Sequence, residues 1–96
     1  MVVEFLTFRV DPADFDTWMV TEERTWSRFL ATMPGFIRKE VWQPPDEPGI
    51  VHAVIWWENK EAWQAVTPEQ VAEIDGEMGA WLREPVAQEY HVLRTH

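Results

Sequence analysis

The sequence predicts an α+β fold, in which a four-stranded antiparallel sheet carries its helices on one face. The first observation is the order of the segments, which runs strand, helix, strand, strand, helix, strand over 96 residues. The second is the stretch 50–57 (IVHAVIWW), the longest apolar run in the chain. Its length and β-branched content are typical of a central strand buried on both faces. A chain of this length forms one domain, residues 1–96.

The first two elements are a strand and a long helix. Residues 2–10 alternate as a strand that is largely apolar on both faces. Asp11 then provides an N-cap and Pro12 the first helical position of a helix that runs to Met33. One helical stripe spans an arc of roughly 120°. It contains Phe15, Trp18, Met19, Glu22, Trp26, Phe29, Leu30 and Met33.

The middle of the chain predicts two paired strands. Pro34-Gly35 ends the helix, and residues 36–43 form a strand with three consecutive charges, which indicates an edge position. In regular alternation Phe36 shares a face with Arg38, and Lys39 lies on the other face. A loop rich in turn residues then leads into the strand 50–57, which we expect to pair antiparallel with 36–43.

The last third predicts a short helix, a long helix and an edge strand. Asn59 caps the short helix, and Thr67 with Gln70 forms a capping box for a helix that reaches about Arg83. Gly76 and Gly79 in that helix suggest that another segment approaches closely. Residues 86–94 have the mixed polarity of a second edge strand.

This order is the ferredoxin-like split βαβ pattern, in which the first and third strands are central. Two helices cover only one face of such a sheet. The other face is also apolar here, so it needs a cover. A second copy of the chain, related by a two-fold axis, is the simplest one, and we expect a homodimer.

Composition excludes several classes of partner. The net charge is −9, with 8 Lys+Arg against 17 Asp+Glu, and no basic cluster is present. We therefore expect no binding to nucleic acid or to anionic membranes. Without cysteine the chain forms no disulfide or thiolate site. No signal-peptide pattern or membrane span is visible, so we expect a cytoplasmic protein.

Three stretches resemble a known superfamily: VVEFLTFRV at 2–10, PGFIRKEVW at 34–42, and the strand that ends in Trp56-Trp57. The chain resembles the dimeric α+β barrel superfamily, whose best-known branch is antibiotic biosynthesis monooxygenase-like. It looks most similar to a group of small, uncharacterised, largely cyanobacterial proteins of that fold. The resemblance implies a homodimer with facing sheets and, in each subunit, a cleft between sheet and helices.

The relatives include cofactor-free oxygenases of polycyclic aromatics, haem-degrading enzymes and isomerases of small ring compounds. Haem-degrading relatives use a histidine on a helix and an asparagine on the first strand. The histidines here, His52, His91 and His96, are on no predicted helix, and the first strand has no asparagine. We therefore predict no cofactor.

Two polar residues interrupt apolar surfaces and are candidate catalytic groups. His52 lies in the strand 50–57 and is a candidate general base, or alternatively a structural histidine or one at the dimer interface. Glu22 lies within the apolar helical stripe, and a carboxylate removed from water is a candidate acid or base. Alternatively Glu22 is paired within the fold.

Five further residues are candidates for substrate binding. Trp18, Trp26 and Trp56 would line an aromatic cleft between the sheet and the first helix, although the same residues suit a packed core. Asp75 and Tyr90 would add polar groups.

A metal site would need carboxylates and His91 to meet across strands. The candidates are Glu4, Glu40 and Glu89, but no short His spacing supports such a site, so we predict no metal.

Two functional hypotheses remain open at this point. In the first, the protein is a small dimeric enzyme or binder of a planar hydrophobic molecule, of the cofactor-independent monooxygenase-like or isomerase-like type. Alternatively it is a non-catalytic dimer that acts through a protein partner. The sequence does not decide whether it is an enzyme, nor which ligand it takes.

Overall fold

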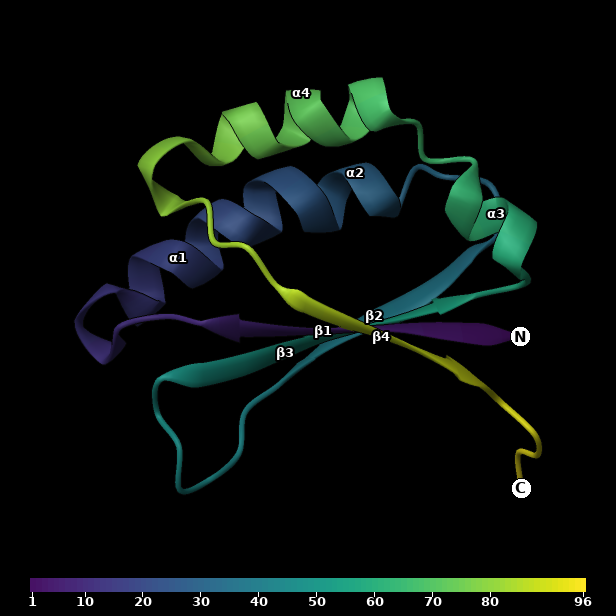
Figure 1. Ribbon diagram of the computed structural model, residues 1–96, viewed down its shortest axis with the longest axis horizontal. Helices are drawn as coiled ribbons and strands as arrows, with labels where there is room; N and C mark the ends of the chain where they lie inside the picture. The colour runs from purple at the N-terminus through teal and green to yellow at the C-terminus, as the bar shows by residue number, and fades with distance from the viewer.

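The computed structural model describes all residues, 1–96, as one sheet covered on one side by helices (Figure 1). The strands are β1 (Val2–Arg9), β2 (Phe36–Trp42), β3 (Ile50–Trp57) and β4 (Val86–His91). They are antiparallel in the order β2-β3-β1-β4. This confirms the predicted fold, with β1 and β3 central and β2 and β4 at the edges. β4 ends at His91 rather than at the predicted Arg94.

The first helical region is continuous but not uniform. Asp11 accepts a hydrogen bond from the Ala13 amide (2.8 Å), as expected of an N-cap, and a short 3-10 turn follows at Pro12–Asp14. The region continues as α1 (Phe15–Glu22), a π-helical turn (Glu23–Ser27) and α2 (Arg28–Leu30). The prediction of a single regular helix to Met33 is therefore wrong in detail.

The π-turn contains side-chain and backbone hydrogen bonds that mark its irregular geometry. The Thr25 hydroxyl donates to the Thr21 carbonyl (2.8 Å), a bond of the kind that bends helices. At the end of the turn the Arg28 amide donates to the Glu23 carbonyl, five residues earlier.

The second helical region begins as its caps predict. Asn59 caps α3 (Lys60–Gln64), and Thr67 and Gln70 form the capping box of α4 (Pro68–Met78). α4 ends before the predicted Arg83, because Gly79 has a left-handed φ of 57° and begins a 3-10 turn at Gly79–Trp81. A Cβ atom added at Gly76 or Gly79 would meet no other part of the chain within 4 Å, so the structure does not show the expected close approach on that side of either glycine.

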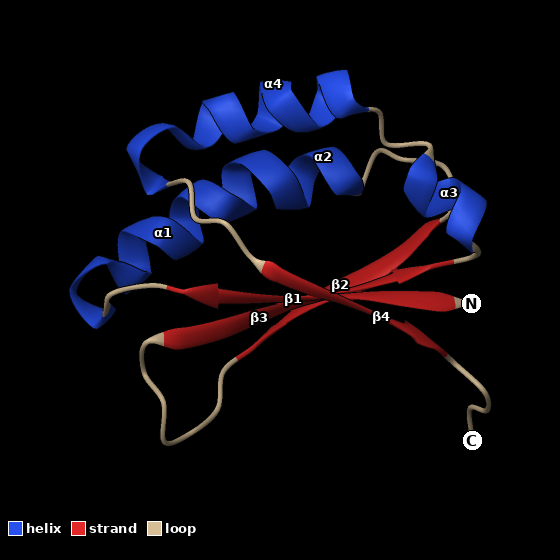
Figure 2. Ribbon diagram, viewed as in Figure 1, coloured by secondary structure: helices blue, strands red, loops and turns tan.

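The helices occupy one side of the sheet, and the other side has none (Figure 2). Two groups of buried side chains join the layers. One is centred on Val2, Leu30, Ile55 and Trp57. The other is centred on Val10, Trp18, Val51 and Met78. No helix of the structure combines the length and hydrophobicity that a membrane span requires.

β2 contains a bulge that changes which side chains face the helices. Phe36 pairs with Trp57 and Arg38 with Trp56, so Ile37 is an extra residue in β2. Beyond the bulge Arg38 lies on the open side and Lys39 on the helix side. The predicted sharing of one face by Phe36 and Arg38 is therefore wrong, because regular alternation does not anticipate a bulge.

Candidate functional site: a cavity between sheet and helices

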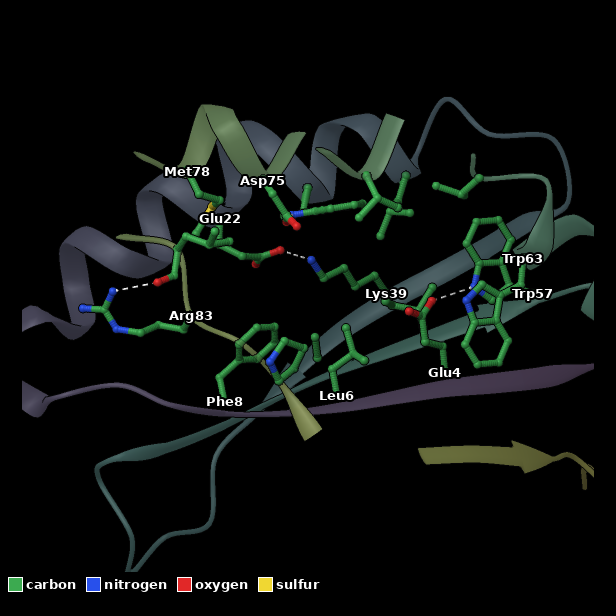
Figure 3. Close-up of a pocket in the computed structure, with 18 of the residues that line it drawn as sticks. Glu4, Leu6, Phe8, Glu22, Lys39, Trp57, Trp63, Asp75, Met78 and Arg83 are labelled. Carbon is green, nitrogen blue, oxygen red and sulfur yellow. Dashed lines mark hydrogen bonds and ion pairs between the residues drawn. The ribbon is translucent and has the colours of Figure 1, made fainter. Parts of the chain in front are cut away.

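A cavity of about 570 Å³ lies between the helix-covered face of the sheet and the helices. Thirteen of the 21 residues that line it are hydrophobic, a balance typical of small-molecule sites. Its walls include residues of both buried groups, among them Trp18, Met78, Leu30 and Trp57. The charged lining residues are Glu4, Glu22, Lys39, Asp75 and Arg83 (Figure 3).

A buried ion pair links the first helix to β2 inside this cavity. Lys39 Nζ donates to Glu22 Oε1 and to Ser27 Oγ (2.8 Å), and the Ser27 hydroxyl also donates to Glu22 Oε1 (3.1 Å). The side chains of Lys39 and Glu22 are only 8% and 5% exposed. Burial of either charge alone would be costly, so each depends on the other. The expectation that a buried Glu22 has a partner is confirmed.

Glu4 is the second carboxylate on the cavity wall. It extends from the central strand β1, and its Oε1 accepts a hydrogen bond from Trp57 Nε1 (3.1 Å). Desolvation raises the pKa of Glu4 above its ordinary value, although the Trp57 hydrogen bond and the charges of Lys39 and Lys60 act in the opposite direction. Glu4 thus combines access to the cavity with a carboxyl group that holds its proton more tightly than an exposed glutamate does.

Asp75 reaches the same cavity from α4. Its Oδ1 accepts a hydrogen bond from Trp26 Nε1 (3.0 Å), so α4 is joined to the π-turn of the first helical region. In Figure 3 Asp75 lies on the helix side, Glu4 on the sheet side, and the Glu22–Lys39 pair between them. Polar groups therefore face one apolar cavity from both layers.

The structure brings four of the sequence-predicted site residues together in the cavity: Trp18, Glu22, Trp26 and Asp75. The indole Nε1 of Trp18 is buried without a hydrogen-bond partner, and its ring packs on Phe8 at a centroid distance of 5.0 Å.

Three other predicted site residues lie on the opposite, open face of the sheet and do not line the cavity: His52, Trp56 and Tyr90. His52 Nδ1 is 3.0 Å from Thr7 Oγ1, and its ring lies 4.8 Å from that of Phe5. Tyr90 is half exposed and packs edge-on against Phe5.

Trp56 shares the open face with polar and aromatic neighbours. The Arg38 guanidinium lies 3.9 Å from its ring centroid, and Trp42 packs against it at 6.2 Å. The expected aromatic cleft between sheet and first helix therefore contains Trp18 and Trp26 but not Trp56. The reason is alternation, since Trp56 and Trp57 point to opposite faces of β3.

Sequence reasoning did not select Glu4 or Lys39 as site residues. The sequence does contain an indication for Glu4, because it is the only charged residue on the β1 face that carries Val2, Leu6 and Phe8. That is the criterion that selected Glu22. Lys39 had no comparable signal, since its position depends on the β2 bulge.

The cavity residues do not fit haem held by an axial histidine, because no histidine lines the cavity. No group of three or more His, Cys, Asp or Glu side chains is arranged to hold a metal ion. Of the carboxylates considered for such a site, Glu40 is paired with Arg38, and Glu89 with Lys60.

Comparison with solved structures supports the fold over the whole chain. SnoaB, a cofactor-independent oxygenase from Streptomyces nogalater, is 18% identical, with a TM-score of 0.71 over 98% of this chain and 94% of SnoaB. The ActVA-Orf6 monooxygenase of Streptomyces coelicolor, solved with the ligand nanaomycin D, is 18% identical, with a TM-score of 0.79 over 99% of this chain and 89% of that protein.

The haem degrader MhuD from Mycobacterium tuberculosis, solved with two haems in its active site, is 19% identical, with a TM-score of 0.81 over 100% of this chain and 99% of MhuD. At these identities the likeness establishes the fold alone. No curated protein sequence matches the chain significantly. The family model described as antibiotic biosynthesis monooxygenase matches residues 1–67, which is more than half of the chain, and the chain therefore belongs to the antibiotic biosynthesis monooxygenase family.

Proposed function

We propose that the cavity binds a planar hydrophobic small molecule and that the protein acts on it as a cofactor-independent monooxygenase-like or isomerase-like enzyme. The observation that carries this proposal is the cavity itself, about 570 Å³ in volume, mostly apolar, and provided with a few polar groups. Family membership supports it. Two structural neighbours, SnoaB and ActVA-Orf6, are an oxygenase and a monooxygenase by name.

In this proposal the walls have separate tasks. Trp18 and Trp26 provide flat apolar surface for a ring system, and Asp75 offers a hydrogen-bond acceptor to the ligand. Glu22 fixes the position of Lys39, so that an ammonium group is held inside a desolvated space. An apolar enclosure that contains fixed charges favours reactions in which charge develops on the substrate.

A binding experiment tests this site with two ligands that structural neighbours hold. Nanaomycin D and haem are titrated separately into the protein, binding is measured by calorimetry, and the haem titration is also followed by its absorption spectrum. We expect nanaomycin D, a planar ring compound, to bind. We expect haem to show no spectrum of histidine-ligated iron, because the cavity lacks a histidine.

Two variants locate the bound nanaomycin D. Ala53 is buried on the cavity wall, so Ala53→Leu adds volume inside the cavity and should weaken binding at least about tenfold. His52→Ala changes the open face and should leave the affinity within about twofold. The opposite pattern, with binding lost only in His52→Ala, would reject the cavity as the ligand site.

We also propose that the protein is a homodimer joined through the open face, defined here by Phe5, Trp42, His52, Trp56, Val86 and Tyr90. The face has no helix over it (Figure 2). Large apolar side chains are exposed there, with Trp42 44% and Val86 69% accessible. A second copy of the same face would bury them.

The alternative function, a non-catalytic dimeric interaction module, draws on the same exposed surface. This alternative predicts that no small molecule binds in the cavity. Failure of all aromatic ligands to bind, in a protein that is dimeric and folded, would favour this alternative.

A further inference from the structure

Glu4 and Lys39 occupy one row of the sheet on the cavity side. Glu4 in β1 and Lys39 in β2 both pair with Ile55 of β3, one from each side. All three side chains line the cavity, and Lys39 is near enough for its charge to act on Glu4. A ligand that rests on Ile55 would therefore have a carboxylate at one edge and an ammonium group at the other.

Both groups retain unused hydrogen-bonding capacity. Glu4 Oε1 accepts from Trp57, whereas its Oε2 has no hydrogen-bond or ion-pair partner in the chain. An ammonium group has three donors, and Lys39 uses two of them, on Glu22 and Ser27. One acceptor and one charge-assisted donor thus remain for a ligand.

We propose that Glu4 is the general base of this cavity and that Lys39 binds the oxyanion that forms when Glu4 removes a proton from a carbonyl or phenolic ligand. The inference rests on the proposed small-molecule site. For a ketone, the Glu4 carboxylate takes a proton from the carbon next to the carbonyl and becomes a neutral acid. The electron pair of the C–H bond forms a carbon–carbon double bond, the carbonyl π pair moves to the oxygen, and Lys39 donates to the resulting enolate oxygen. Return of the proton to another carbon isomerises the ligand.

The other cavity carboxylates are less suited to this role. Glu22 Oε1 is already paired with the Lys39 ammonium and the Ser27 hydroxyl, so protonation of Glu22 would disrupt a buried ion pair. Asp75 is on the helix side, outside the row that places Glu4 opposite Lys39. Desolvation raises the pKa of Glu4, which makes its carboxylate a stronger base than an exposed one.

Hydrogen–deuterium exchange of 2-tetralone, a small bicyclic ketone, tests the inference without knowledge of the natural substrate. The ketone is incubated with the full protein in D2O, and loss of the proton signal next to the carbonyl is followed by NMR, with buffer-only exchange subtracted. We expect the wild-type protein to accelerate exchange. We expect Glu4→Gln, which keeps an oxygen for Trp57, to reduce the acceleration at least about 100-fold.

The controls separate the base from a structural role. Glu73→Gln, the same change on an exposed carboxylate of α4, should exchange at the wild-type rate. Lys39 is tested in the paired replacement Glu22→Gln with Lys39→Met, which removes the ammonium group without leaving a buried charge, and exchange should fall at least about tenfold. In the wild-type protein, the exchange rate should rise with pH as Glu4 loses its proton, and the midpoint of this rise should lie above the ordinary pKa of a glutamate. This measurement needs no variant.

The possible results distinguish a failure of the proposed base from a failure of the proposed ligand site. A wild-type protein that binds 2-tetralone but does not accelerate exchange contradicts the inference alone, as does a Glu4→Gln variant that exchanges at the wild-type rate. A protein that binds neither 2-tetralone nor nanaomycin D contradicts the proposed function as well.

Discussion

Glu4 illustrates how one partly buried carboxylate can be tolerated in an apolar cavity. Its charged form loses hydration, and the single indole hydrogen bond from Trp57 does not replace what water supplied. The neutral form is therefore favoured relative to an exposed glutamate, and the folded state binds the Glu4 proton more tightly than the unfolded chain does. Folding stability must depend on this proton.

The first prediction concerns that dependence. Because the pKa of Glu4 is raised in the folded state, its ionisation removes stability as pH increases from the ordinary glutamate range, about 4.3, through the raised value. Glu4→Gln cannot ionise. Relative to wild type it should gain stability over that window, by about 1.4 kcal/mol for each pKa unit.

Urea unfolding of the wild-type protein and of Glu4→Gln at pH 4 and at pH 8 measures the difference between their unfolding free energies at each pH. The remaining carboxylates contribute equally to the two proteins. If Glu4→Gln became less stable relative to wild type as the pH rises, the assignment of a desolvated Glu4 would be wrong.

The Glu22–Lys39 pair gives the second prediction at the residue scale. Lys39→Met leaves the Glu22 carboxylate buried with only Ser27 beside it, so it should cost about 3–5 kcal/mol of unfolding free energy. Adding Glu22→Gln removes the stranded charge and should recover most of that loss. Chemical denaturation of the two variants checks this, and additive losses would show that the charges are independent.

At the scale of elements, two irregularities create the site. Residues 18, 22, 26 and 30 all line the cavity. In a regular α-helix each step of four residues advances 40° beyond a full turn, so this series would drift around the helix. The wider π-turn at Glu23–Ser27 reduces the drift. On the sheet, the bulge in β2 places Lys39 opposite Ile55, so that its side chain lies on the cavity side.

These irregularities define what the sequence can predict about this chain. Strand order, caps and the apolar helical stripe depend on local residue patterns, so they were predictable, as were Glu22 and Asp75 within the cavity. The β2 bulge and the π-turn depend on pairing and on tertiary contacts. Lys39 was therefore missed. His52 was selected because it interrupts an apolar strand, but periodicity does not show which face of a doubly apolar strand meets the helices.

Replacing each of the two glycines of the second helical region by alanine should have opposite effects on stability, which tests where α4 ends. Gly76 lies within α4 and an added Cβ there meets nothing, so Gly76→Ala should raise stability by about 0.5–1 kcal/mol. Gly79 has equally free space but a left-handed φ of 57°, so Gly79→Ala should lower stability by about 1–2 kcal/mol. Thermal unfolding distinguishes the two, and equal effects would contradict the assigned end of α4.

At the scale of the whole molecule, the sheet separates two surfaces of different character. Its helix-covered face encloses the cavity (Figure 3). Its open face, which has no helix over it (Figure 2), presents large aromatic side chains. The proposed dimer and the proposed ligand site therefore lie back to back across one layer of strands. Variants can alter either surface without direct contact with the other.

The dimer prediction uses this separation. Trp42, 44% exposed beside Trp56, should lie in the interface, so Trp42→Glu should weaken the dimer by about 2 kcal/mol or more. Val20→Glu, at a residue of α1 that is 48% exposed, should leave the dimer intact. Light scattering over a dilution series measures both. A wild-type protein that stays monomeric at micromolar concentration would contradict the proposed interface.

The tryptophans allow a direct test of the central claim, that the cavity is the ligand site. Their indole N–H resonances can be assigned by single Trp→Phe replacements and followed by NMR as nanaomycin D is added. Trp18, Trp26, Trp57 and Trp63 line the cavity, whereas Trp42 and Trp56 lie on the open side of the sheet. We predict saturable shifts of the cavity resonances with the Trp42 and Trp56 signals unchanged. Shifts confined to Trp42 and Trp56, with the four cavity resonances unmoved, would show that the ligand binds on the open face and not in the cavity.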